Sequence, residues 1–97
     1  MSIVVRYNPA GLTKETYDGA SENVQEGQWP PEGLEMHVCF GEDGDLKVSE
    51  IWDSEEQWRA FTEELFPRLQ EAGVQMGSEP QVFEVHAFQT REGATSA

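Results

Sequence analysis

The chain has 97 residues and a formal net charge of −13, from 19 acidic and 6 basic side chains. Such an acidic surface is repelled by nucleic-acid phosphates and by anionic membranes, so we expect neither as a partner. The hydrophobic residues, 37% of the chain, can fill one small core but not two. We therefore expect a single domain over residues 1–89 and a flexible tail over residues 90–97.

The single cysteine, Cys39, cannot form an internal disulfide, and the chain does not open with a long apolar run. Both features are typical of a protein of the cytoplasm, which is the location we expect. Cys39 lies in a strand-like stretch, where a buried thiol is more often inert than nucleophilic.

The N-terminal third is predicted to form a strand, a helix and a loop. Ser2–Asn8 is rich in β-branched residues and is followed by proline, which indicates a strand. Thr13 is a suitable cap for a helix that runs to about Gln25. In the loop Gln28–Glu32 two prolines favour an extended chain. Trp29 in this loop either covers a pocket or plugs the core, and we favour the plug.

A hairpin is predicted in the middle of the chain. The residues of Gly33–Phe40 alternate in polarity, as do those from Leu46 to Asp53, and the link GEDGD between them carries two glycines. Ser54 and Gln57 then form a capping box, which marks the start of a helix.

This helix carries Trp58, Phe61 and Leu65 on one face. Pro67 lacks the N–H that a helix interior needs. We therefore expect the helix to end or kink there, and a short second helix to run to Ala72.

A last strand is predicted at Pro80–Gln89. The order of elements is then β-α-β-β-α-β, which right-handed crossovers fold into a ferredoxin-like α+β domain, a four-stranded antiparallel sheet with two helices on one face. Most of the strands have apolar residues on both faces. Because the helices cover only one face, we expect a second copy of the chain to cover the other and to form a homodimer.

Two histidines and a glutamate are the polar residues that we consider as catalytic. His37 and His86 lie in strands that are otherwise apolar, and Glu50 is two residues before Trp52 on the same strand face. A carboxylate beside an imidazole in an apolar pocket orients the ring and tunes its basicity, which produces a general base. The alternative is that each histidine is merely hydrogen-bonded within the fold or at the dimer seam.

Whether His37 meets Glu50 depends on the register of the hairpin. The two side chains lie on opposite faces of the sheet if Val38 faces Val48, and they share a face if His37 faces Val48. A bulge can also shift the register, so both arrangements stay open. A metal site is weakly supported, because the three candidate ligands come from three strands without a local ligand spacing. We expect no metal and no cofactor.

Aromatic residues are dense for a chain of this length, at 10%. Taken singly, Trp52, Trp58 and Phe61 are more often core than ligand platform, and Tyr7 and Trp29 add to this aromatic group. Together they form a surface on which a small aromatic or polyketide-like ligand can stack. An enzyme of this kind needs a cavity of at least about 300 Å³ beside the helices.

The stretch IWDSEEQWRAF at Ile51–Phe61, together with MHV around His37 and EVH ending at His86, resembles the dimeric α/β-barrel superfamily. Within it, the resemblance is to the small proteins related to antibiotic biosynthesis monooxygenases. It implies a ferredoxin-like homodimer in which Trp52 and Trp58 line a pocket between sheet and helices. It also implies a cofactor-independent oxygenase, or a cyclase or isomerase, that acts on phenolic polyketides.

Two departures narrow the chemistry that this resemblance implies. Val48 occupies the strand position at which the quinone-forming oxygenases tend to have a pocket asparagine. Phe61 stands where the haem-degrading branch has a tryptophan, and Gln70 or Glu71 lies near its expected histidine, so we do not expect haem degradation. A non-catalytic dimeric ligand-binding or accessory module is the alternative function.

Overall fold

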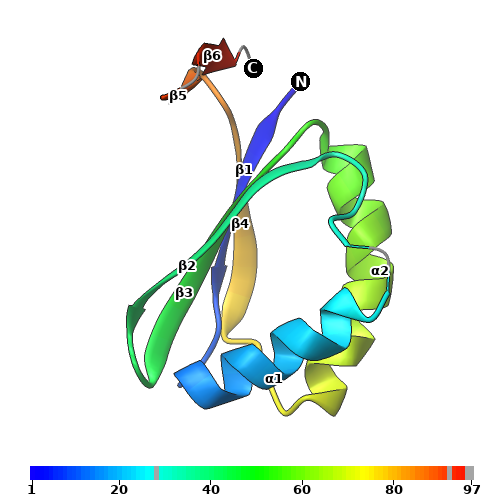
Figure 1. Cartoon of the computed structure of the whole chain (residues 1–97), viewed down its shortest axis with the longest axis vertical. Coiled ribbons are helices and arrows are strands. Elements are labelled where there is room, and N and C mark those ends of the chain that lie inside the picture. The colour runs from blue at the N-terminus through cyan, green and yellow to red at the C-terminus, as the bar shows by residue number, and fades with distance from the viewer. Residues whose placement is uncertain (28, 92, 96–97) are drawn as a thin grey trace.

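The computed structural model describes residues 1–27, 29–91 and 93–95, the last three as backbone only. Its elements are, in order, β1 (Ile3–Asn8), α1 (Lys14–Gln25), β2 (Leu34–Glu42), β3 (Asp45–Trp52), α2 (Glu55–Glu71), β4 (Ser78–Glu84), β5 (Phe88–Thr90) and β6 (Gly93–Thr95). The first four strands form an antiparallel sheet in the order β2-β3-β1-β4, and both helices cover one face of it (Figure 1). This is the predicted ferredoxin-like βαββαβ fold. We call the helix-covered face the inner face and the opposite face the outer face.

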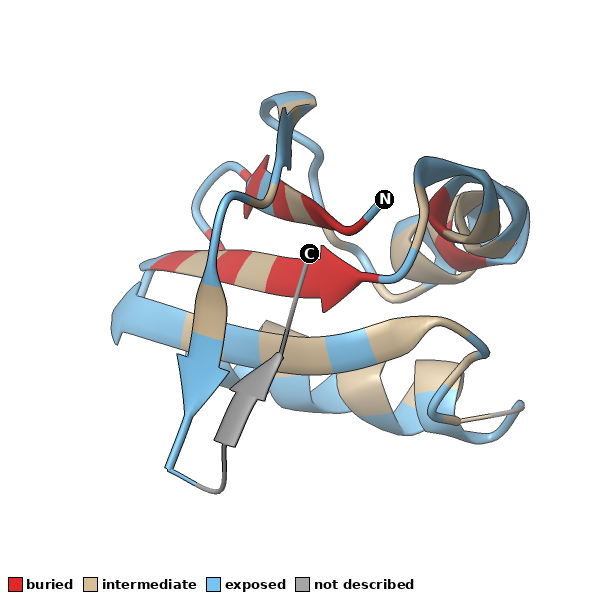
Figure 2. Ribbon diagram, turned by 90° about the horizontal axis from the view of Figure 1, so that it is seen from above, coloured by how far each residue is buried: buried red, intermediate tan, exposed pale blue. Residues whose placement is uncertain are grey.

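The core lies between the central strands and the helices. Figure 2 shows that buried residues concentrate on β1 and β3, the two strands with a neighbour on both sides. Their side chains alternate between the faces, so every second residue enters the core. The buried cluster consists of Ile3, Val5, Tyr7, Val48, Trp52 and Trp58.

The hairpin between β2 and β3 is closed by a two-residue turn. Asp43 and Gly44 form it, and Gly44 has a φ of +89°, a conformation that favours glycine. This tight turn pairs Glu42 with Asp45, and counting back along the strands places His37 directly opposite Glu50. Residues directly opposite in an antiparallel pair share a face. The sequence analysis considered Val38 or His37 opposite Val48, whereas Cys39 is opposite Val48 in the structure. Like the second of those registers, this one brings His37 and Glu50 to the same face.

The predicted helix starts are confirmed. The Thr13 hydroxyl accepts the backbone N–H of Thr16 at 3.1 Å, and the Ser54 hydroxyl accepts that of Gln57 at 3.2 Å. Each hydroxyl satisfies one of the donors that the first turn of a helix leaves free.

The predicted break at Pro67 is wrong, since α2 continues through it to Glu71. Pro67 is on the exposed side of the helix, and buried Leu65 anchors the turn before it. The guanidinium of Arg68 then donates to the backbone oxygen of Asn23 at 2.9 Å, which ties the last turns of α2 to the end of α1. These tertiary contacts outweigh the missing hydrogen bond.

The predicted last strand, Pro80–Gln89, is too long. Strand β4 ends at Glu84, which pairs with Ile3 at the very start of β1, and the last backbone bond to this segment is from Val85 N–H to the Ser2 oxygen at 3.0 Å, one residue before His86. Beyond it the chain forms the β5–β6 hairpin, which extends past the end of the sheet (Figure 1). Part of the expected tail is thus paired, while residues 92, 96 and 97 lie outside the described residues. Within the described part of the chain, no helix has the length and hydropathy that a membrane crossing requires.

Candidate active site

A buried carboxylate, Glu50, lies at the centre of the inner face and is 3% exposed. Its Oε1 accepts the hydroxyl proton of Tyr7 at 3.1 Å and the indole N–H of Trp52 at 3.0 Å. Its Oε2 lies 2.7 Å from Nδ1 of His37 on the neighbouring strand. A carboxylate is costly to bury without such partners, and here both oxygens have one.

Tyr7 connects this carboxylate to helix α2. The indole N–H of Trp58 donates to the Tyr7 oxygen at 2.7 Å, so the hydroxyl proton of Tyr7 is free to point at Glu50. Burial, and then the negative charge of Glu50, raise the pKa of Tyr7 far above that of a free phenol. Tyr7 therefore keeps its proton and acts as a fixed donor.

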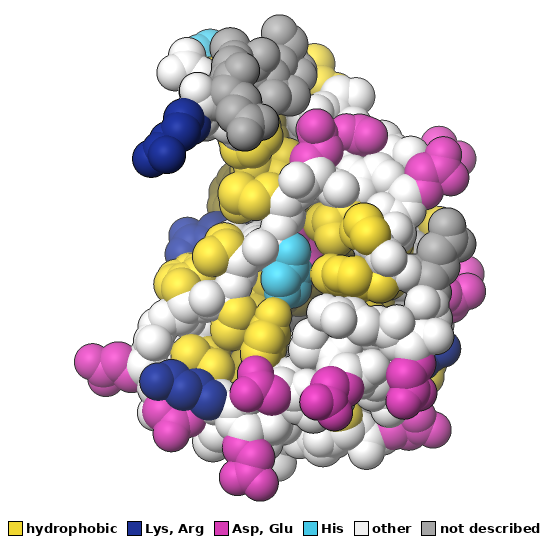
Figure 3. Space-filling model, in the orientation of Figure 1, with side chains coloured by type: hydrophobic (Ala, Val, Ile, Leu, Met, Phe, Trp, Pro, Cys, Tyr) yellow, Lys and Arg dark blue, Asp and Glu magenta, His cyan; other side chains and the backbone are white. Residues whose placement is uncertain are grey.

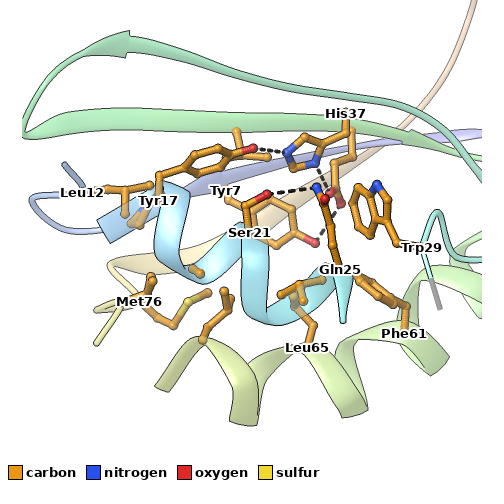
Figure 4. A pocket seen from close by; sticks show the side chains of 17 residues that line it. Tyr7, Leu12, Tyr17, Ser21, Gln25, Trp29, His37, Phe61, Leu65 and Met76 are labelled. Atoms are coloured by element: carbon orange, nitrogen blue, oxygen red, sulfur yellow. Dashed lines mark hydrogen bonds and ion pairs between the residues drawn. The ribbon is translucent and has the colours of Figure 1, made fainter. Parts of the chain in front are cut away.

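His37 meets a second tyrosine at its other ring nitrogen. Nε2 lies 2.7 Å from the hydroxyl of Tyr17 on α1, and the two rings are stacked with centroids 6.2 Å apart (Figure 4). The ring of Trp29 stands edge-on to the imidazole at 5.8 Å. About a quarter of the His37 side chain is exposed, so this end of the network is reachable from solvent. Burial is the first cause of a raised pKa at Tyr17.

The network opens into a cavity of about 110 Å³ between the inner face and the two helices. Aromatic side chains line it beside His37, and the aliphatic Leu65 and Met76 lie toward its far end (Figure 4). On the side of the molecule seen in Figure 3, hydrophobic side chains are visible at the surface where the strands meet the helices.

The cavity does not reach the size that the sequence analysis required for an enzyme acting on an aromatic or polyketide-like substrate. Its 110 Å³ falls below the roughly 300 Å³ at which most small-molecule sites begin. An engineered cavity of about 150 Å³ holds benzene. The present cavity is smaller than that one, so a single ring fills it and extends beyond it, and a polycyclic polyketide does not fit between these side chains as they stand.

The structure brings most of the predicted site residues together. His37 and Glu50 are in contact, and Tyr7, Trp29 and Phe61 line the cavity with them. Trp29 is thus a half-buried wall residue beside His37, closer to the pocket cover than to the favoured core plug.

Three predicted site residues lie elsewhere. Trp52 and Trp58 are 0% and 6% exposed and stand behind the cavity wall, where Trp52 packs on Phe61 with ring centroids 5.4 Å apart. His86 follows the end of β4, is exposed, and does not line the cavity. The reason is the early end of β4, since beyond Glu84 no strand holds the chain over the inner face.

Sequence reasoning missed the contact of Tyr17 with the site. Its helical spacing marks it as a core residue, and nothing within α1 shows that its hydroxyl reaches a histidine 20 residues away. The one usable signal is a phenol on the buried side of a helix that must pack over the strand of His37. Among the described residues, no three His, Cys, Asp or Glu side chains are grouped as a metal ion requires.

No protein-family model matches the sequence, and no curated protein matches it either. Solved structures do match over almost the whole chain. A variant of SnoaB, a cofactor-independent oxygenase from Streptomyces nogalater, is 18% identical with a TM-score of 0.60, and the match covers 93% of this chain and 94% of that one.

Two further structures are similar. A conserved protein from Methanosarcina mazei is 18% identical with a TM-score of 0.56, over 86% of this chain and 89% of that one. A candidate antibiotic biosynthesis monooxygenase from Chloroflexus aurantiacus is 19% identical with a TM-score of 0.51, over 87% and 90%. The chain has their fold. At these identities the likeness shows the fold and not an activity.

Proposed function

We propose that this protein is a cofactor-independent enzyme that removes a proton from a compact, single-ring substrate, with His37 as the base that finally holds the proton. The observation that supports this most directly is the 2.7 Å contact between His37 Nδ1 and the buried Glu50 carboxylate at an aromatic cavity. A carboxylate in this position fixes the imidazole ring and stabilises the imidazolium that forms when the ring takes up a proton.

The lining of the cavity points to a neutral substrate. It contains no Lys or Arg among the described residues, and its one carboxylate, that of Glu50, repels anions. The rings of Trp29 and Phe61, whose centroids are 6.4 Å apart, offer faces to a flat ligand. Phenols and enolisable cyclic ketones are uncharged, can consist of a single ring and carry a hydrogen that a base can remove.

Loss of the proton leaves an enolate or a phenolate in the cavity. This anion either takes up a proton at another atom, which yields an isomer or a cyclised product, or it gives an electron to O₂ and combines with it, which yields an oxygenated product. SnoaB, which has the same fold, is a cofactor-independent oxygenase, and this supports the second outcome. In both outcomes the first step is the same proton removal.

The test is the exchange of hydrogen for deuterium at the carbons beside the carbonyl of cyclohexanone in D₂O, followed by NMR. We expect the protein to accelerate exchange, and His37→Ala to lose about 100-fold of that acceleration. The exposed histidine provides a matched control, since His86→Ala should exchange at the wild-type rate. Oxygen uptake with hydroquinone then separates an oxygenase from an isomerase. Equal exchange by wild type and His37→Ala would refute the proposal.

Glu50→Gln tests the orienting carboxylate. The amide turns its NH₂ group either to the Tyr7 and Trp52 donors, where donor faces donor, or to His37 Nδ1, which must then accept and move its proton to Nε2. We expect exchange to fall and the free energy of unfolding to drop by about 1–3 kcal/mol, measured by urea denaturation. Glu63→Gln, at an exposed position of α2, should leave the exchange rate unchanged and should change the free energy of unfolding by less than about 0.5 kcal/mol.

The small cavity favours one second candidate, a dimeric binding or accessory module without catalysis. In it, the hydrogen bonds around Glu50 serve only to satisfy a buried polar cluster. This candidate predicts that His37→Ala and Glu50→Gln lose stability while no probe is turned over by any variant. Exchange that collapses in His37→Ala at an unchanged melting temperature would exclude it.

We also propose a homodimer through the outer face, which the helices leave bare. A row of apolar side chains crosses this face, because Val4 pairs with Phe83 on one side and with Ile51 on the other, and Ile51 pairs with Met36. Phe83 is 51% exposed and Phe40 41%. Ile51 within the row is only 6% exposed, so the exposed apolar side chains lie on the edge strands, where a second copy can cover them.

A further inference from the structure

We propose that the hydroxyl of Tyr17, and not the imidazole itself, meets the substrate and relays its proton to Nε2 of His37. This inference deepens the proposed function and rests on it. It makes Tyr17 a catalytic residue and His37 the base behind it.

The hydrogen-bond network determines where the protons lie. The indole of Trp58 can only donate, so Tyr7 accepts there and gives its own proton to Glu50. An ionised Glu50 can only accept, which places a proton on Nδ1 of His37. In the neutral ring Nε2 then carries a lone pair, and the hydroxyl of Tyr17 donates to it.

Both nitrogens of His37 are therefore occupied. Nδ1 is held by Glu50 at 2.7 Å and Nε2 by Tyr17 at the same distance, while the Trp29 ring stands at the edge of the imidazole. A substrate in the cavity finds no free ring nitrogen. Tyr17 itself lines the cavity, and its hydroxyl oxygen, which Figure 4 shows beside His37, has a lone pair left after donating its proton.

The relay moves two protons in one step, and each bond that breaks is matched by one that forms. The substrate's C–H or O–H bond breaks and its proton forms a new O–H bond on Tyr17, while the original O–H bond of Tyr17 breaks and that proton forms an N–H bond on Nε2. The bonding pair of the substrate stays behind as the enolate or phenolate. The products are a neutral Tyr17 and an imidazolium held against the Glu50 carboxylate, and no oxidant or reductant is consumed.

The electrostatics of Tyr17 favour a concerted relay over a free tyrosinate. Burial first, and then the nearby groups Cys39, Glu50 and Asp18, raise the pKa of Tyr17. The hydroxyl thus keeps a proton at neutral pH, so it can pass one on only while it receives another.

The first measurement needs no substrate. In ¹⁵N NMR spectra of the histidine-labelled protein, we expect the neutral form of His37 to carry its proton on Nδ1, and the Nε2 signal to move in Tyr17→Phe. A proton on Nε2 of neutral His37 would overturn the relay, because Tyr17 could not then donate to that nitrogen.

The second measurement is the cyclohexanone exchange in D₂O. We expect Tyr17→Phe to lose about 100-fold with little change in melting temperature, whereas Thr62→Val, which removes a hydroxyl outside the cavity, keeps the wild-type rate. A Tyr17→Phe variant that exchanges as fast as wild type, while His37→Ala does not, would overturn the relay and leave the proposed function standing. Exchange by neither wild type nor any variant would overturn both.

A third measurement guards against a purely structural effect of Tyr17→Phe. Placing 3-fluorotyrosine at position 17 keeps the ring, its packing and the hydroxyl, but makes the phenol more acidic. We expect the alkaline decline of the exchange rate to move to lower pH, because Tyr17 then loses its relay proton sooner. An unchanged pH profile would contradict the relay.

Discussion

At the scale of single residues, the site depends on how the donors around Glu50 are arranged. Trp52 and Tyr7 both point at Oε1, which leaves Oε2 for His37 alone. The oxygen nearer the cavity is thus left to the imidazole, while the two fixed donors hold the other oxygen in place. Within the described residues, every buried side-chain nitrogen and oxygen has a partner.

Tyr7 leads to a prediction at this scale, because burial raises its pKa in the folded state above the ordinary value of 10.0. Above about pH 10 the unfolded chain ionises this phenol and the folded chain does not, so the folded state binds more protons. The stabilisation that protonated Tyr7 gives to the folded state is therefore complete below about pH 10 and is lost progressively as the pH rises above that value. We expect the free energy of unfolding to fall by up to about 1.4 kcal/mol per pH unit from this group.

Urea denaturation of wild type and Tyr7→Phe, compared between about pH 9 and about pH 11, measures this slope. Tyr7→Phe lacks the titrating group and should show a shallower decline, whatever its stability at neutral pH. Parallel declines of the two proteins would mean that Tyr7 ionises normally in the folded state.

At the scale of elements, helix α2 runs through a proline because other contacts hold its last turns. Pro67→Ala restores an N–H that can donate to the carbonyl of Glu63, so we expect stability to rise by about 1–2 kcal/mol in urea denaturation. The exposed Gln70→Ala in the same part of the helix should stay within about 0.5 kcal/mol. A loss of stability in Pro67→Ala would instead indicate that Pro67 begins a separate helix.

The hairpin of β2 and β3 is the element that assembles the site. Its two-residue turn places His37 opposite Glu50, and a slip of one residue would move the histidine to the outer face. The register shift between Leu34 and Met36 lies beyond this pair, at the far end from the turn, so it leaves the contact intact.

At the scale of the whole molecule, the bare outer face leads to the prediction of a dimer. Light scattering at micromolar concentration should give twice the mass of the chain. Phe83→Glu places a charge at the exposed end of the apolar row, on β4, and should give the mass of a single chain. Ala60→Glu adds the same charge at an exposed position of α2 and should leave the dimer intact. A wild-type mass of one chain would contradict the dimer.

Much of this architecture can be read from the sequence, because it depends on residues that are close along the chain. The alternation in each strand, the Thr13 and Ser54 caps and the order of elements together predict the ferredoxin-like fold. The alternation also puts Glu50 and Trp52 on one face. Each of these features needs only local geometry.

Only the tertiary structure decided which of these residues meet. The Asp43–Gly44 turn set the register that joins His37 to Glu50, and the packing of α1 over β2 brought the hydroxyl of Tyr17 to Nε2 of His37. The end of its partner strand β1 stopped β4 before His86. Such contacts join residues far apart in sequence. They depend on which residues of a loop form the turn, on where a partner strand ends and on how a helix packs, and the polarity pattern of a single strand or helix does not determine any of these.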